Sequence, residues 1–203
     1  MDYSQLGSEA QIDKTKKSLE ANGINVIVVK NGEEAKKKVQ EIIPKGAEVM
    51  TMTSITLETT GIAKEINESG AYNAVRSRLM KMDRKTQGDE MQKLGAAPEW
   101  AIGSVHAVAE DGTIMIASAT GSQLPAYAYG SRHVIWVVGA QKLVKDMDDG
   151  IKRNYAYTLP LESERAKKAY GAPGSSVNKL LIIKKEVQPE RMTMIIVNEM
   201  LGY

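Results

Sequence analysis

The sequence predicts an α/β protein with a three-layer α/β/α fold, in which a mostly parallel sheet carries one antiparallel hairpin. Helical segments alternate with short, β-branched apolar segments through the first fifty residues, and this succession is typical of parallel β-α-β winding. Asp111-Gly112 stands between two apolar runs, which is a strong hairpin signal because Gly tolerates positive φ. The length of 203 residues is most simply one domain, 1–203.

Three helices and two strands are predicted in the first third of the chain. Residues 8–22 form a helix with Ser8 as N-cap, and 24–29 form a strand that we expect to be buried on both faces. A second helix over 33–43 leads into a strand over 47–52. A third helix begins after Ser54 as N-cap and is extended by 62–68.

The segment 71–98 is charged, carries irregularly spaced Met and Leu, and is interrupted by Gly88 and Gly95. We expect one or two helices that form a lid or an inter-subunit surface, the latter in a homodimer.

The second half predicts the hairpin and the remaining strands. We expect one strand over 101–109 and its hairpin partner over 113–119, followed by a short helix after Gly121. Further predicted elements are a central strand over 133–139, helices over 146–157 and 162–170, and strands over 179–186 and 192–199.

Composition excludes several function classes. The chain has no cysteine, so it forms no disulfide, thiolate zinc site or iron–sulfur cluster of its own, and with two histidines we expect neither a metal nor any cofactor in this chain. Absence of cysteine also suggests a cytoplasmic location. A net charge of +2 gives no reason to expect nucleic-acid binding, and no apolar run approaches the roughly 18 residues of a membrane span.

Candidate ligand-binding residues gather at three junctions where a predicted strand ends. Hydroxyls and free backbone N–H groups at such positions bind anions, and ligands of α/β sheets favour strand carboxyl ends. Simple helix capping is the alternative. The junction residues are Ser54 and Thr56; Thr120, Gly121 and Ser122; and Gly139, Gln141 and Lys142.

Three further residues are candidates by their chemistry. Glu58 follows the first junction and is the candidate catalytic carboxylate, with capping or a salt bridge as the alternative. Lys142 or Arg153 could clamp an anion, with an ordinary surface charge as the alternative. His106 is either a ligand-binding residue or a hydrogen-bonded strand residue.

The chain resembles the lactate-utilisation (LUD) domain family, which includes LutC-type proteins. The segments that carry the resemblance are Ser54-Ile55-Thr56-Leu57-Glu58, Asp111-Gly112-Thr113, Thr120-Gly121-Ser122, Val137-Val138-Gly139 with Lys142, Ile151 with Arg153, and Leu201-Gly202-Tyr203. Compared with the family pattern, Met52-Thr53 replaces a Gly, and His106 and Gln141 each stand where an Asn is usual. Both of the latter are at the expected site, so the resemblance implies a changed ligand.

The resemblance implies a NagB/RpiA/CoA-transferase-like fold and two functions. The first is a non-redox accessory subunit that binds a small anionic ligand and works with iron–sulfur partner proteins in the oxidation of lactate to pyruvate. The alternative is a stand-alone enzyme acting on a phosphorylated or CoA-linked metabolite, with Glu58 as base or nucleophile.

Overall fold

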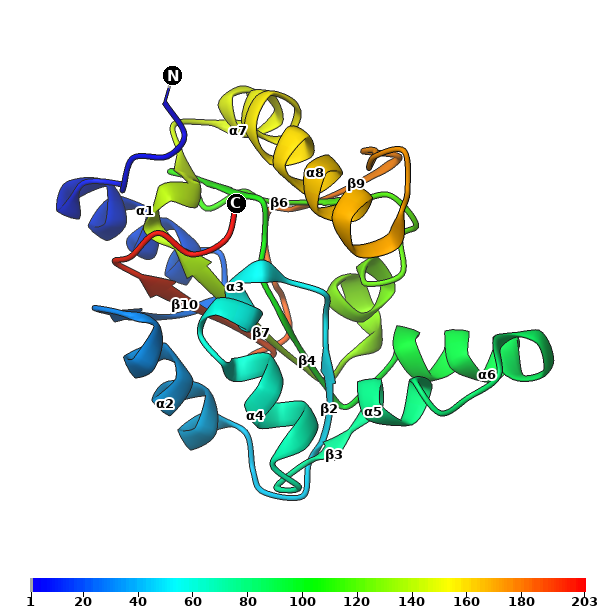
Figure 1. Cartoon of the computed structure of the whole chain (residues 1–203). Coiled ribbons are helices and arrows are strands. Elements are labelled where there is room, and N and C mark those ends of the chain that lie inside the picture. Colours follow the sequence, from blue (N-terminus) through cyan, green and yellow to red (C-terminus); the bar gives the residue numbers. More distant parts are fainter. Residues whose placement is uncertain (1) are drawn as a thin grey trace.

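A six-stranded sheet forms the centre of the computed structural model, which describes residues 2–203 (Figure 1). Its strand order is β1-β10-β7-β4-β2-β3, and every pairing is parallel. The strands are β1 (Asn25–Val29), β2 (Glu48–Thr51), β3 (Asn73–Ala74), β4 (Trp100–Gly103), β7 (His133–Gly139) and β10 (Met192–Val197).

Strands β7 and β10 are central because both of their faces are apolar. In β7, Val134, Trp136 and Val138 pack into one apolar cluster. The alternate residues Ile135 and Val137 pack into another cluster on the opposite face of the sheet. A strand buried on both faces needs such a nearly continuous apolar run, so the central position predicted for 133–139 is confirmed.

Strand β1 lies at an edge of the sheet, and the prediction that it is buried on both faces was wrong. Only Val29 of its five residues is buried, and the side chain of Val28 is 41% exposed. An apolar run indicates that a segment favours a β-strand. It does not indicate whether that strand pairs with one or with two neighbouring strands in the sheet.

A second, four-stranded sheet contains the predicted hairpin. Its order is β8-β5-β6-β9, and β5 pairs antiparallel with β6 across the Asp111-Gly112 turn. These strands are β5 (Ala107–Ala109), β6 (Ile114–Ser118), β8 (Leu143–Val144) and β9 (Lys179–Ile183). The single strand predicted over 101–109 is therefore two strands in two sheets, because the chain leaves the central sheet at Ser104 and enters the second at Ala107.

Helices cover both sides of this arrangement and give the three-layer α/β/α fold. One face of the central sheet packs against α2, α3 and α4. The other face packs against α1 and the second sheet, whose outer side is covered by α7. The helices on these faces are α1 (Glu9–Ala21), α2 (Gly32–Ile42), α3 (Ile55–Thr59), α4 (Ile62–Glu68) and α7 (Met147–Arg153).

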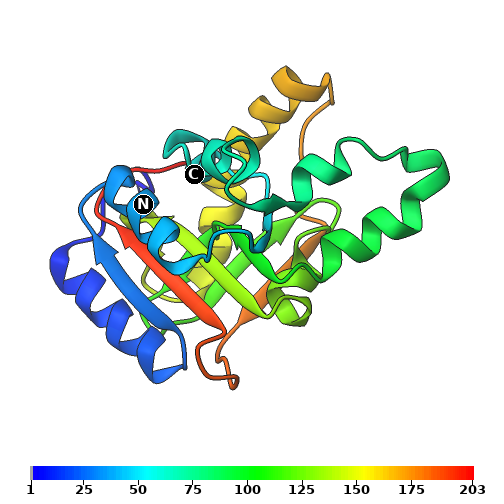
Figure 2. The ribbon, with the colours of Figure 1, turned by 90° about the horizontal axis from the view of Figure 1, so that it is seen from below.

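Two helical segments extend from this core. The predicted segment 71–98 contains α5 (Val75–Leu79) and α6 (Arg84–Ala96), and α6 projects away from the sheets (Figures 1 and 2). After α7, the chain continues through a π-helical turn, Asn154–Thr158, into α8 (Leu159–Tyr170). Pro160 does not interrupt this path, because it lies in the first turn of α8, where proline is tolerated. No helix within residues 2–203 is both long and apolar enough to cross a membrane.

Candidate functional site

A pocket of about 940 Å³ opens at the carboxyl ends of the central strands. The segments that follow β2, β4 and β7 form its floor, and the α5–α6 arm, the end of β6 and α8 form its walls. This is the edge of a parallel sheet where ligands usually bind, and the volume suits a molecule of drug or cofactor size.

Lys142 lies on the floor of the pocket and is only 2% exposed. Its Nζ donates to Thr56 Oγ1 at 3.1 Å and to Ser104 Oγ at 3.0 Å. Among residues 2–203, Lys142 forms no ion pair with a carboxylate. A buried ammonium group is thus held by neutral hydroxyls alone.

Thr56 connects this lysine to the carboxyl-terminal segment. Its hydroxyl donates to the carbonyl oxygen of Leu201 at 3.0 Å, so the hydroxyl oxygen is left to accept from Lys142. Residues that follow β2, β4, β7 and β10 therefore meet around one nitrogen atom. This convergence follows from the parallel sheet, which brings the ends of its strands to the same edge.

The surroundings of Lys142 favour its neutral form. Burial lowers the pKa of Lys142 to about 7, and the positive charge of Arg153 acts in the same direction. At neutral pH the amine is therefore divided between its ammonium and free-base forms.

His106 lines the same pocket and is neutral. Its Nδ1 accepts a hydrogen bond from the backbone N–H of Ala117 at 3.0 Å, so the ring proton lies on Nε2. Burial and then the charges of Lys142 and Arg153 lower the pKa of His106 to about 3. At physiological pH this residue can donate a hydrogen bond to a ligand but carries no charge.

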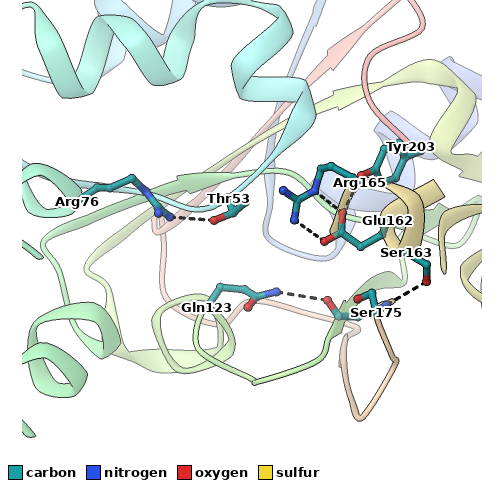
Figure 3. A network of polar contacts seen from close by, with 9 residues as sticks. Thr53, Arg76, Gln123, Glu162, Ser163, Arg165, Ser175 and Tyr203 are labelled. Atoms are coloured by element: carbon teal, nitrogen blue, oxygen red, sulfur yellow. Dashed lines mark hydrogen bonds and ion pairs between the residues drawn. The ribbon is translucent and has the colours of Figure 1, made fainter. Parts of the chain in front are cut away.

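Arg76, on α5, lines a wall of the pocket. Its Nε donates to the carbonyl oxygen of Thr51 at 2.8 Å, and its Nη2 donates to Thr53 Oγ1 at 3.3 Å (Figure 3). Burial lowers the pKa of Arg76, but a guanidinium group remains charged at neutral pH. Since its contacts are to neutral oxygens, this charge is available to an anion.

Glu162, Arg165 and Tyr203 form a polar cluster on the opposite side (Figure 3). Arg165 binds Glu162 through two hydrogen bonds of 2.7 Å, and the Tyr203 hydroxyl donates to the same carboxylate at 2.7 Å. Burial acts to raise the pKa of Glu162, but these hydrogen bonds lower it overall. Tyr203 thereby anchors the carboxyl-terminal segment to α8.

The pocket favours anions by its charge. Four of its lining side chains are cationic and one is acidic: Arg76, Arg84, Lys142 and Arg165, against Glu162. Because Arg165 and Glu162 neutralise each other, the remaining three cations determine the sign of the potential.

The structure brings seven of the predicted site residues together around this pocket, which are Ser54, Thr56, His106, Thr120, Gly121, Ser122 and Lys142. At the second junction, the Gly121 N–H donates to Ser118 Oγ at 2.8 Å, and the Ser122 N–H donates to Thr120 Oγ1 at 3.3 Å. Ser54 caps α3 by accepting from the Leu57 N–H. The residues at these two junctions thus line the pocket and also satisfy backbone N–H groups of the local turn or helix.

Gly139 and Gln141 lie behind the floor and outside the pocket lining. The Gln141 amide donates to the carbonyl oxygens of Leu201 and Gly202 at 3.0 and 3.1 Å. A Cβ at Gly139 would lie 2.8 Å from both the backbone oxygen of Glu199 and the backbone nitrogen of Leu201, so only glycine fits there. In this structure both residues position the carboxyl-terminal segment.

Arg153 also lies beneath the pocket. It is fully buried, and its Nη1 donates to the carbonyl oxygen of His106 at 2.5 Å and to Thr158 Oγ1 at 2.9 Å. Its guanidinium lies 5.1 Å from the centre of the Tyr157 ring and acts on Lys142 through its charge.

Glu58 is exposed on α3 and lies outside the pocket lining. The charge of Glu58 acts on Arg76, which does line the pocket, so this carboxylate is near the site without facing into it.

Sequence reasoning missed Ser104 and the Glu162 cluster as site residues. Ser104 carries the signal that identified Ser54, a hydroxyl after an apolar strand, but the predicted strand ran through it. Glu162 and Tyr203 are 41 positions apart, and no local pattern relates them.

Comparisons with known proteins agree with this architecture. The family model described as the LUD domain matches residues 12–197. A crystal structure of a DUF162 family protein from Deinococcus radiodurans superposes with a TM-score of 0.59 over 96% of this chain and 100% of that one. Their sequence identity is 12%, so this likeness concerns the fold alone. No curated protein is significantly similar in sequence. Since the family match spans nearly the whole chain, the protein belongs to the LUD-domain family.

Proposed function

We propose that the chain is a LutC-type, non-redox accessory subunit that binds a small anionic metabolite in this pocket. The metabolite is an acid of the lactate oxidation pathway, and iron–sulfur partner proteins carry the electrons. Membership of the LUD family supports the pathway. The single observation that supports the ligand class is Lys142, a buried cation on the pocket floor that contacts hydroxyls and, within residues 2–203, no carboxylate.

The chemistry of binding follows from the cost of burying a charge. A buried ammonium without a counter-ion is unfavourable, and a bound carboxylate offsets that cost through a charge-assisted hydrogen bond. Arg76 supplies a second positive charge at the wall, and His106 supplies a neutral N–H donor. An acid with a polar group beside its carboxylate would contact Lys142, Arg76 and His106.

Calorimetric titration with lactate, pyruvate and longer oxo and hydroxy acids tests the proposal. We expect at least one acid to bind, and the Lys142→Met variant to bind it at least about tenfold more weakly. Lys152→Met is the matched control, because Lys152 is exposed on α7 and lies outside the pocket lining. Equal affinities of wild type and Lys142→Met would contradict the proposal.

The partner is tested separately by affinity purification of the tagged chain from its native host. We expect an iron–sulfur protein to co-purify and to be recognised by its visible absorption. Purification of the chain without any iron–sulfur or flavin protein, from cells grown on lactate, would contradict the accessory role.

A stand-alone enzyme acting on a phosphorylated or CoA-linked metabolite is the second candidate, and the Lys142 amine, whose pKa lies near 7, favours it. The sequence assigned Glu58 as base or nucleophile and Lys142 or Arg153 as the anion clamp, and of these three only Lys142 lines the pocket. A Glu58→Gln variant that kept full turnover on such a substrate would eliminate that role for Glu58.

A further inference from the structure

The geometry around Lys142 leaves one position of its nitrogen open for the lone pair of a nucleophile. A neutral amine has two hydrogens and one lone pair. The Nζ has two acceptors within hydrogen-bond distance, Thr56 Oγ1 and Ser104 Oγ, and Thr56 is fixed in its accepting role by Leu201. Both amine hydrogens are thereby used, and the lone pair occupies the remaining position of a side chain that lines the pocket.

We infer that Lys142 forms a reversible imine with an oxo acid, a compound that carries a carbonyl group next to its carboxylate. The inference rests on the proposed function and narrows its ligand class, because a hydroxy acid such as lactate has no ketone or aldehyde carbon with which an amine forms an imine.

The charge state of Lys142 supports this chemistry. An amine attacks a carbonyl only as its free base, and the pKa of Lys142 of about 7 makes that form abundant at neutral pH. Burial and a nearby cation produce the low pKa, and these are the two general means by which proteins activate lysine nucleophiles. Exposed lysines of the chain, such as Lys152, lack the burial.

The reaction balances without an oxidant or reductant. The nitrogen lone pair forms a bond to the carbonyl carbon, and the carbonyl oxygen takes up a proton. The nitrogen then loses one of its protons to solvent, which gives a carbinolamine. A further proton adds to the hydroxyl group, which leaves as water while the carbon–nitrogen double bond forms. The resulting protonated imine keeps the positive charge of the lysine beside the ligand carboxylate.

Other residues of the pocket can bind the rest of the ligand. Arg76 offers a cation for the carboxylate, while Ser104 and the neutral His106 offer hydrogen-bonding groups beside the departing water. The volume of about 940 Å³ exceeds what a three-carbon acid occupies, so longer oxo acids are also accommodated.

Reductive trapping tests the inference. The intact protein is incubated with pyruvate and sodium cyanoborohydride, digested, and analysed by mass spectrometry. We expect the reduced pyruvate adduct on the peptide that contains Lys142, at least about tenfold above any other lysine. Acetone, a neutral ketone of similar shape, should label Lys142 much more weakly, because it lacks the carboxylate.

Calorimetry of the wild type with the same acids separates this inference from the proposed function, because acid binding does not require a nucleophilic amine. The Lys142→Arg variant has no nucleophilic amine and should give no adduct at this position. Acid binding by the wild type without an adduct on Lys142 would overturn the imine and leave the proposed function standing. Equal labelling by acetone and pyruvate would overturn the oxo-acid specificity. Absence of both acid binding and adduct would overturn the two proposals together.

Discussion

Arg153 Nη1 donates a 2.5 Å hydrogen bond to the carbonyl oxygen of His106. This bond joins the end of α7 to the short segment between β4 and β5, where the chain passes from one sheet to the other. His106 lines the pocket, whereas Arg153 is fully buried beneath it. The contact therefore holds part of the pocket floor, and the positive charge of Arg153 acts on Lys142.

The first prediction concerns the cost of burying Lys142. Replacing it by Met removes an uncompensated buried charge while keeping an apolar side chain of similar length. We expect Lys142→Met to increase the free energy of unfolding by roughly 1–3 kcal/mol at pH 7, measured by urea denaturation. Lys152→Met should change it by less than about 0.5 kcal/mol. A marked loss of stability in Lys142→Met would indicate that the hydroxyl contacts outweigh the cost of burial.

The second prediction concerns the charge of Arg153. Because that charge lowers the pKa of Lys142, Arg153→Met should raise it. Competitive labelling with acetic anhydride over a pH series gives the pKa of individual lysines. We expect a midpoint of about 7 for Lys142 in the wild type and a higher midpoint in Arg153→Met. Arg153→Lys keeps the charge and is the control. An unchanged midpoint in a folded Arg153→Met variant would contradict this coupling.

Much of this site could be predicted from the sequence, because several of its residues follow a local pattern. Ser54, Thr56 and Lys142 each follow a short apolar strand, and parallel strands bring such positions to one edge of the sheet. The sequence did not indicate which junction residue faces inward. Lys142 faces the pocket, whereas its neighbour Gln141 turns to the carboxyl-terminal segment, and the two differ only in their direction along one 3₁₀ turn.

Other features were not predictable because they depend on long-range pairing. The edge position of β1 is determined by β10, which pairs with it from the other end of the chain. The contact between Glu162 and Tyr203 likewise requires the folded chain. Local hydrophobic pattern gives the type of an element, but it does not give its neighbours.

The third prediction concerns acid stability. The folded-state pKa of His106, about 3, lies below its ordinary value of 6.5, so the unfolded chain binds more protons between these values. Stability from this residue is fully present above pH 6.5 and decreases as the pH falls toward 3. Near pH 5 the wild type should lose about 1–2 kcal/mol relative to a His106→Gln variant, with both referred to their values at pH 7. Parallel pH profiles of the two proteins in urea denaturation would contradict a neutral His106.

The fourth prediction concerns the clamp between Gln141 and the carboxyl-terminal segment. Gln141→Ala leaves the buried carbonyl oxygen of Leu201 with one hydrogen bond instead of two, so we expect a loss of about 1–3 kcal/mol in the free energy of unfolding. Tyr203→Phe is the matched comparison, because it removes only the hydrogen bond to Glu162 at the other end of the segment and should cost about 0.5–1.5 kcal/mol.

Limited proteolysis separates a local role of the clamp from a general one. If Gln141 holds the segment in place, Gln141→Ala should release a carboxyl-terminal fragment faster than the wild type under conditions where the rest of the chain stays intact. Since Tyr203 lines the pocket, the same variant should also bind the anionic ligand more weakly. Accelerated cleavage throughout the chain, without preference for this segment, would show instead that Gln141 supports the whole fold.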